Sequence, residues 1–149
     1  MILDYDLATP KQKTMADLGL LLLRLPLGAY FLVAGVNKTL SGVGAFVNGN
    51  IEKAPLPHGL ASAYLHCVPF AEMLVGIGII LGFATRWVTL IGLLMVVSFI
   101  IAVTKLKGGG APFDTNVLIV GMLIGVNFVG PGRISADKMI VTRRERRAP

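Results

Sequence analysis

The run from Pro69 to Arg86 constrains the fold most, because it is apolar almost throughout and carries one carboxylate, Glu72, inside it. A helix on the surface of a soluble protein keeps a polar face, and this stretch has none. A helix in a bilayer is apolar all round, and an acid within it needs a partner or a function. Of the 149 residues, 54% are hydrophobic and 15% are charged, whereas a soluble domain has roughly 25% charged residues. We therefore expect an all-α integral membrane protein.

Four segments have the composition of membrane-spanning helices, and we expect them to form a four-helix bundle. Each approaches the roughly 20 residues that cross a bilayer. Within a single membrane domain, 1–149, the predicted spans cover residues 17–36, 64–85, 87–104 and 115–130, and a basic cytoplasmic tail covers 133–149. The long connection after the first span also predicts a short amphipathic surface helix built on Val43, Phe46, Val47 and Ile51.

The basic residues are divided unevenly between the two sides of this topology. With both termini in the cytoplasm, the inner flanks hold Lys11, Lys13, Arg86, Arg133, Lys138, Arg143, Arg144, Arg146 and Arg147. The outer loops hold only Lys38, Lys53, Lys105 and Lys107. The positive-inside rule therefore predicts cytoplasmic termini. We expect the arginines at the C-terminal end to bind anionic lipid, which accounts for the net charge of +6 without a nucleic-acid partner.

Three polar residues lie deep inside the predicted spans: Arg24, Glu72 and Asn127. At about 1.5 Å per residue, Arg24 lies roughly 10 Å from the inner edge of the bilayer and Glu72 roughly 12 Å from the outer edge. An unpaired charge at such a depth costs about 2.5–3.5 kcal/mol or more. We therefore expect Arg24 to pair with Glu72, with Asn127 nearby. The cluster is a structural ion pair, a quinone or proton site, or a contact for a partner subunit.

Lys38 and Asp114 are expected at the outer interface, where they would line the mouth of such a site. Lys38 lies about 15 Å in depth from Glu72, so we expect it to be a poorer partner for this acid than Arg24 is. The two histidines and the single Cys67 lack metal-ligand spacing. The chain also lacks a phosphate-binding or dinucleotide-binding motif. We therefore expect no metal and no nucleotide.

Glycines four residues apart occur in the second and fourth predicted spans, at Gly78 and Gly82 and at Gly121 and Gly125. This spacing lets two helices approach each other closely. We therefore expect these glycines to pack helices within the bundle or against a partner subunit.

An ordered set of short motifs in this chain resembles the DoxX family. The set comprises Leu-Leu-Leu-Arg24-Leu-Pro-Leu-Gly, Ala34-Gly-Val-Asn-Lys38, Pro69-x-x-Glu72-x-x-x-Gly76, Gly82-x-x-Thr85-Arg86, Asp114-Thr-Asn116 and Gly130-Pro-Gly-Arg133-x-Ser135-x-Asp137. The resemblance implies a four-helix membrane bundle and a tie to membrane oxidoreductases. Related proteins are subunits of a thiosulfate:quinone oxidoreductase, and others are associated with redox defence.

These observations lead to three functional hypotheses. The first is a subunit of a quinone-linked oxidoreductase complex in the bacterial inner membrane, with quinone as its cofactor and other membrane proteins as partners. In it, Arg24 and Glu72 would position or protonate the quinone. The second is a non-catalytic accessory subunit that stabilises a larger complex, and the third is a small-solute transporter. These hypotheses include both a subunit that binds quinone and one that takes no part in catalysis.

Overall fold

The structure is a computed structural model that describes residues 10–54, 56–107 and 115–145. These residues contain no strand and form α1 (Pro10–Leu40), α2 (Val43–Asn50), η2 (Ile51–Lys53), α3 (His58–Leu81), α4 (Thr85–Lys107), α5 (Thr115–Val129) and α6 (Ala136–Glu145). The four long helices α1, α3, α4 and α5 correspond to the four predicted spans. The all-α fold class is confirmed, and α2 with η2 forms the short helix that was predicted after the first span.

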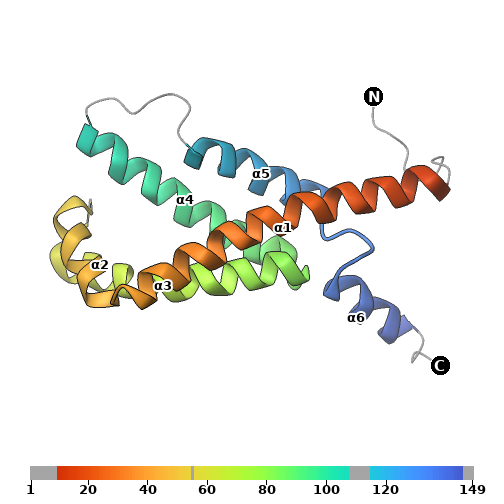
Figure 1. The fold of residues 1–149 in the computed structure, drawn as a ribbon, viewed down its shortest axis with the longest axis horizontal. Coiled ribbons are helices and arrows are strands. Elements are labelled where there is room, and N and C mark those ends of the chain that lie inside the picture. The colour runs from red at the N-terminus through yellow and green to blue at the C-terminus, as the bar shows by residue number, and fades with distance from the viewer. Residues whose placement is uncertain (1–9, 55, 108–114, 146–149) are drawn as a thin grey trace.

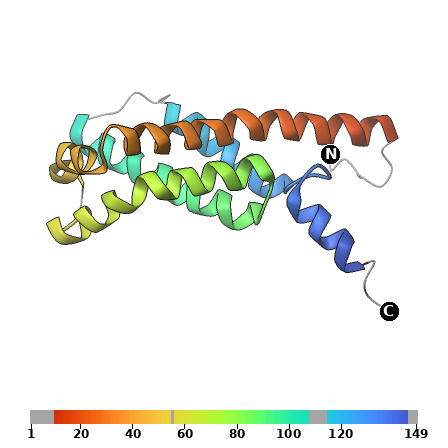
Figure 2. The ribbon, with the colours of Figure 1, turned by 60° about the horizontal axis from the view of Figure 1, so that its bottom comes forward.

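The four long helices form two antiparallel pairs that pack on each other (Figure 1). The helix α1 lies along α3, and α4 packs against both α5 and α3. The short helix α2 covers one end of the bundle, and α6 extends away from the opposite end, as a second view shows (Figure 2). We call these the α2 end and the α6 end. The first turn of α1, the α3–α4 turn and α6 all lie at the α6 end.

The centre of the bundle is apolar, and each of the four long helices contributes to it. The core residues are Leu27, Phe31, Val68, Val75, Ile79, Met95, Val96, Ile119, Leu123 and Val126. The outer faces are apolar as well. On α3, Phe70, Leu74, Ile77 and Leu81 form an exposed stripe along one side of the helix. A soluble domain rarely leaves a continuous stripe of this kind in water, whereas a lipid-facing helix requires one.

Helix length and hydropathy support the same conclusion. Among the described residues, Lys11–Leu40 and His58–Leu81 are long and apolar enough to cross a membrane. Thr85–Ile101 and Thr115–Val129 are shorter apolar helices.

The closest approach in the bundle is between α1 and α3, and glycines make it possible. A Cβ atom added to Gly76 would lie 2.5 Å from the backbone nitrogen of Leu32 and 2.7 Å from the carbonyl oxygen of Gly28. A Cβ atom added to Gly35 would lie 2.5 Å from the carbonyl oxygen of Pro69. These backbone contacts fix the register of the two helices, because neither backbone can give way without shifting the whole helix.

Only some of the glycines expected to pack helices do so. Gly78 packs against α4, where an added Cβ would lie 2.8 Å from the Val88 side chain. Gly121 and Gly125 on α5 have nothing within 4 Å of an added Cβ, so they pack against no described residue.

Gly82 ends α3 instead of packing it. Its φ of 64° is left-handed, its N–H donates to the Ile79 carbonyl at 3.3 Å, and the N–H of Phe83 donates to the Gly78 carbonyl at 3.0 Å. This is a helix-terminating arrangement that glycine adopts without strain. Consequently α3 stops at Leu81, earlier than the predicted limit of residue 85, and α4 begins at Thr85.

The glycine contacts predict that Gly76→Ala weakens the bundle. The added methyl group meets backbone atoms of α1, and overpacking of this kind costs about 1–3 kcal/mol. Gly121→Ala is the matched control, because it adds the same methyl group at a position with open space. Thermal unfolding in mild detergent should show a lower midpoint for Gly76→Ala and an unchanged or slightly higher midpoint for Gly121→Ala. Equal midpoints would contradict the α1–α3 register described above.

Candidate functional site

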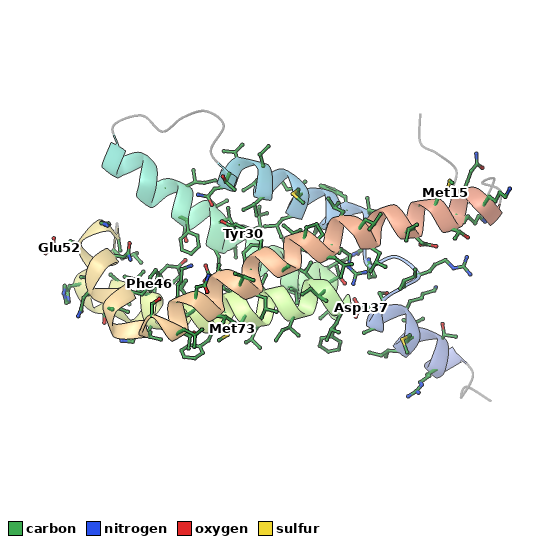
Figure 3. The ribbon with its side chains drawn as sticks, in the orientation of Figure 1. Met15, Tyr30, Phe46, Glu52, Met73 and Asp137 are labelled. Carbon is green, nitrogen blue, oxygen red and sulfur yellow. The ribbon has the colours of Figure 1, made fainter. Side chains whose placement is uncertain are left out.

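Two groups of polar side chains lie at opposite ends of the bundle. One group surrounds Arg24 at the α6 end, and we call it the Arg24 cluster. The other is the ion pair of Lys38 and Glu72 at the α2 end. Figure 3 labels a residue beside each group, Asp137 at the α6 end and Phe46 at the α2 end.

Arg24 is almost completely buried, with 1% of its surface exposed, and its guanidinium group is surrounded by carbonyl groups. Its Nε donates to the Ile79 carbonyl at 2.9 Å and its Nη2 to the Ile80 carbonyl at 3.0 Å. Its Nη1 donates to the carbonyls of Pro131 and Ile134 in the α5–α6 connection. Four of the five N–H groups of an arginine are thereby used.

The carbonyls of Ile79 and Ile80 belong to the last turn of α3, where a helix leaves its carbonyl groups without internal partners. This end also carries the negative pole of the helix dipole, which favours a cation. Arg24 therefore terminates α3 and joins it to the α5–α6 connection. Gly82 is required beside it, because an added Cβ would lie 2.2 Å from Nη2 of Arg24.

Asp137 performs the complementary task at the start of α4. Its carboxylate accepts hydrogen bonds from the backbone N–H groups of Ala84 at 2.7 Å and Thr85 at 3.0 Å, and from the Thr85 hydroxyl at 3.1 Å. The N–H of Asp137 donates to the Gly82 carbonyl at 3.0 Å. An acid at a helix N-terminus satisfies free N–H groups and favours the positive end of the dipole. Asp137 thus ties the first turn of α6 to the α3–α4 turn.

Asn127 belongs to the α6 end as well. Its side-chain amide donates to the Arg86 carbonyl at 3.0 Å and to the Thr89 hydroxyl at 2.7 Å. The Thr89 hydroxyl in turn donates to the Thr85 carbonyl at 2.8 Å. Asn127 therefore fastens α5 to the first turns of α4, and the predicted grouping of Asn127 with Glu72 is wrong.

The Lys38–Glu72 pair joins α1 to α3 near the α2 end. The Nζ of Lys38 donates to Oε1 of Glu72. The Glu72 side chain is 3% exposed and the Lys38 side chain is 25% exposed, so the pair is reached from the lysine side. Nζ also lies 5.2 Å from the ring centroid of Phe46 on α2 and 5.4 Å from that of Phe99 on α4. Both distances fall within the range of cation–π attraction.

The second oxygen of the Glu72 carboxylate has no partner in the part of the chain that the structure describes. Oε2 is buried and accepts no hydrogen bond from the described residues. A buried acceptor left unsatisfied costs about 1–3 kcal/mol, and more when it is charged. This atom is the polar group of the bundle that most clearly calls for a ligand.

The structure corrects the predicted pairing of Arg24 with Glu72. The contacts of α1 with α3 place Arg24 beside Ile80, and Glu72 lies about 12 Å before Ile80 along that helix. Helical side chains lean toward the N-terminus of their own helix. On α1 this direction takes Arg24 away from Glu72 and carries Lys38 toward it. Lys38, expected to be the poorer partner, is therefore the partner of Glu72.

Other residues of the site were not identified from the sequence. Phe46 was expected only as an apolar residue of the short amphipathic helix, and Phe99 was one of many apolar residues in an uncharged span. Asp137 stood in the motif Ser135-x-Asp137, which has the form of a helix start but does not reveal which helix the acid caps. Asp114, predicted at the mouth of the site, lies outside the described residues, as does the glycine run that precedes it.

Comparison with known families matches residues 19–105 to DoxX. The chain belongs to the DoxX family. The match covers the Lys38–Glu72 pair, Phe46 and Phe99, and it identifies the chain as a multi-pass membrane protein. No curated protein and no solved structure matches the chain. Within the part of the chain that the structure describes, no three histidine, cysteine, aspartate or glutamate residues are grouped so that they could hold a metal ion.

The Arg24 cluster predicts a large loss of stability in Arg24→Leu. The carbonyls of Ile80, Pro131 and Ile134 would lose their arginine donor, and the Ile79 carbonyl would keep only the Gly82 N–H. An unsatisfied buried group costs about 1–3 kcal/mol. We expect the free energy of unfolding in detergent to fall by roughly 3 kcal/mol or more. Arg86→Leu is the matched control, because the Arg86 side chain is exposed at the same end of the bundle. Similar unfolding midpoints for the two variants would show that Arg24 does not hold this end together.

The contacts of Asp137 predict that Asp137→Ala releases α6 from the bundle. The variant removes the side-chain acceptor of three hydrogen bonds, and loss of a helix cap costs about 0.5–2 kcal/mol. Limited digestion with trypsin should therefore cut at Lys138 and Arg143 faster than in the unmodified protein. Glu52→Ala, which removes an exposed acid at the α2 end, is the control. An unchanged cleavage rate in Asp137→Ala would contradict this anchoring role.

Proposed function

We propose that this DoxX protein is a quinone-binding membrane subunit of an oxidoreductase complex and that the Lys38–Glu72 pair forms its quinone site. The observation that carries the proposal is the buried carboxylate oxygen Oε2 of Glu72, which has no partner among the described residues. A quinone headgroup is a flat apolar ring whose oxygens are carbonyls when it is oxidised and hydroxyls when it is reduced, so it can present polar oxygens to the Lys38–Glu72 pair.

The surroundings of the pair suit such a headgroup. Lys38 uses one of its N–H donors on Glu72 and can offer another to a ligand oxygen. Phe46 and Phe99 both lie close to its ammonium group and provide the aromatic surface that binding sites for flat organic ligands commonly have. When bound, a quinone would supply two-electron chemistry, and the residues of this chain would bind it and hold its oxygen. Electron transfer to or from it would involve a partner subunit.

The distribution of charge supports cytoplasmic termini within the bacterial inner membrane that we propose as the location. Basic residues gather at the α6 end, where the described chain includes Lys11, Lys13, Arg86, Arg133, Lys138 and Arg143. By the positive-inside rule this end faces the cytoplasm. Its projecting helix α6 would then lie beside anionic headgroups. The Lys38–Glu72 pair would face the outer half of the bilayer.

A second candidate function is a non-catalytic accessory subunit, and one observation favours it. Gly121 and Gly125 on α5 leave space that no described residue fills, beside the exposed side chain of Phe128. A neighbouring membrane helix would fit closely there. Native purification in mild detergent separates the two candidates: an accessory subunit requires a co-purifying membrane protein, whereas a quinone site requires a co-purifying quinone.

The proposal predicts that the purified protein carries quinone and that the pair is needed for it. Solvent extraction of the purified chain should yield quinone close to one molecule per protein. Lys38→Met should reduce this amount about tenfold or more, since a hydrogen bond from a charged donor contributes about 1.5–3 kcal/mol. Lys53→Met is the matched control, because Lys53 is an exposed lysine at the same end of the bundle. Absence of quinone from the unmodified protein, together with no binding of added quinone, would overturn the proposal.

A further inference from the structure

We infer that the Lys38–Glu72 pair prefers the hydroxyl-bearing, reduced form of its ligand, a hydroquinone, over the oxidised quinone. This inference rests on the proposed function and goes further, because it states which form of the ligand the site holds. Its basis is the arrangement of one donor and one acceptor side by side, both belonging to the same ion pair.

The acceptor is Oε2 of Glu72. In its ion pair with Lys38, Glu72 acts as a carboxylate, and in that form its oxygens can only accept hydrogen bonds. Lys38 already donates to Oε1, so Oε2 remains with its lone pairs unused in a buried position. Only a ligand atom that carries a hydrogen can satisfy it.

The donor is Nζ of Lys38. An ammonium group has three N–H donors and no acceptor, and one of them is used on Glu72. A hydroxyl group placed at the pair can meet both residues at once, donating its hydrogen to Oε2 and accepting from Nζ. A quinone carbonyl can only accept, so it meets Lys38 but brings its own lone pairs toward Oε2.

The two forms of the ligand therefore differ by one charge-assisted hydrogen bond in a buried place. A bond of this type contributes enough to change binding about tenfold or more. The lysine is the partly exposed member of the pair, and Glu72 is the buried one.

The test compares the binding of a short-tailed benzoquinone with that of the corresponding benzoquinol to the purified full-length chain in detergent. We expect the quinol to bind at least about tenfold more tightly. A tenfold preference raises the midpoint potential of the bound two-electron couple by about 30 mV relative to the free couple. A redox titration of the bound ligand measures this shift independently of any enzymatic activity.

The variant that tests the acceptor is Glu72→Gln. The amide has nearly the same size but offers both a donor and an acceptor, so the preference for the quinol should shrink to about twofold or less. Glu52→Gln is the matched control, because Glu52 is an exposed acid near the same end, and it should keep the full preference. Size-exclusion chromatography identifies any variant that fails to fold, and in that case the ratio in the unmodified protein still decides.

The outcomes separate this inference from the proposed function. Failure of both forms to bind would overturn the quinone site itself. Equal binding of both forms, or tighter binding of the quinone, would overturn the hydroxyl preference and leave the site standing. An unchanged preference in Glu72→Gln would show that Oε2 is not the atom that selects the ligand.

Discussion

The bundle depends on the hydrogen bonds of one guanidinium group. Arg24 reaches from α1 to the last turn of α3 and to the α5–α6 connection, so it joins segments that are more than fifty residues apart in the chain. The last carbonyl groups of a helix lack partners within it, and each one that is buried without a donor is costly. A planar arginine with five donors satisfies several of them together, which a lysine ammonium cannot do with the same geometry.

The direction of helical side chains explains why two cations on one helix have different roles. Arg24 and Lys38 are both on α1, and both side chains lean toward its N-terminus. Because α3 runs antiparallel, this direction takes Arg24 past the end of α3 and brings Lys38 deeper, toward Glu72. The glycine contacts at Gly28, Gly35 and Gly76 hold α1 and α3 in one register. In this register Arg24 contacts the last turn of α3 and Lys38 contacts Glu72.

Much of the architecture could be predicted from the sequence. Apolar length and basic flanks indicated four long helices, and the amphipathic pattern around Phe46 indicated α2. The partners of the buried charged side chains could not be predicted in the same way. Depth counted along each helix treats a side chain as a point beside its Cα atom, and it placed Arg24 nearer to Glu72 than Lys38 was. In the structure Gly35 lies against Pro69 and Met73, so Lys38, about one turn further along α1, is nearer to the level of Glu72 than Arg24 is already at the backbone. The depths estimated from the span boundaries therefore gave the wrong order.

The helix ends show a second limit. Gly82 was expected to pack a helix, because its spacing from Gly78 fits that role, yet its left-handed backbone ends α3 beside Arg24. Local spacing cannot distinguish a packing glycine from a terminating one when the deciding contact is made by a residue on another helix. The same reasoning applies to Asp137, whose hydrogen bonds go to the start of α4, far from it in the chain.

The contrast between the two polar groups bears on which of them is functional. At the α6 end the charges are used to satisfy backbone groups, and the donors of Arg24 are nearly all taken. At the α2 end a buried carboxylate keeps one oxygen that no described residue contacts with a hydrogen bond. A buried ion pair gives little net stability, and apolar residues of similar size would often serve a bundle as well or better. The two ends therefore differ in how fully their polar groups are satisfied by the described residues, and this difference is the reason for placing the proposed site at the Lys38–Glu72 pair.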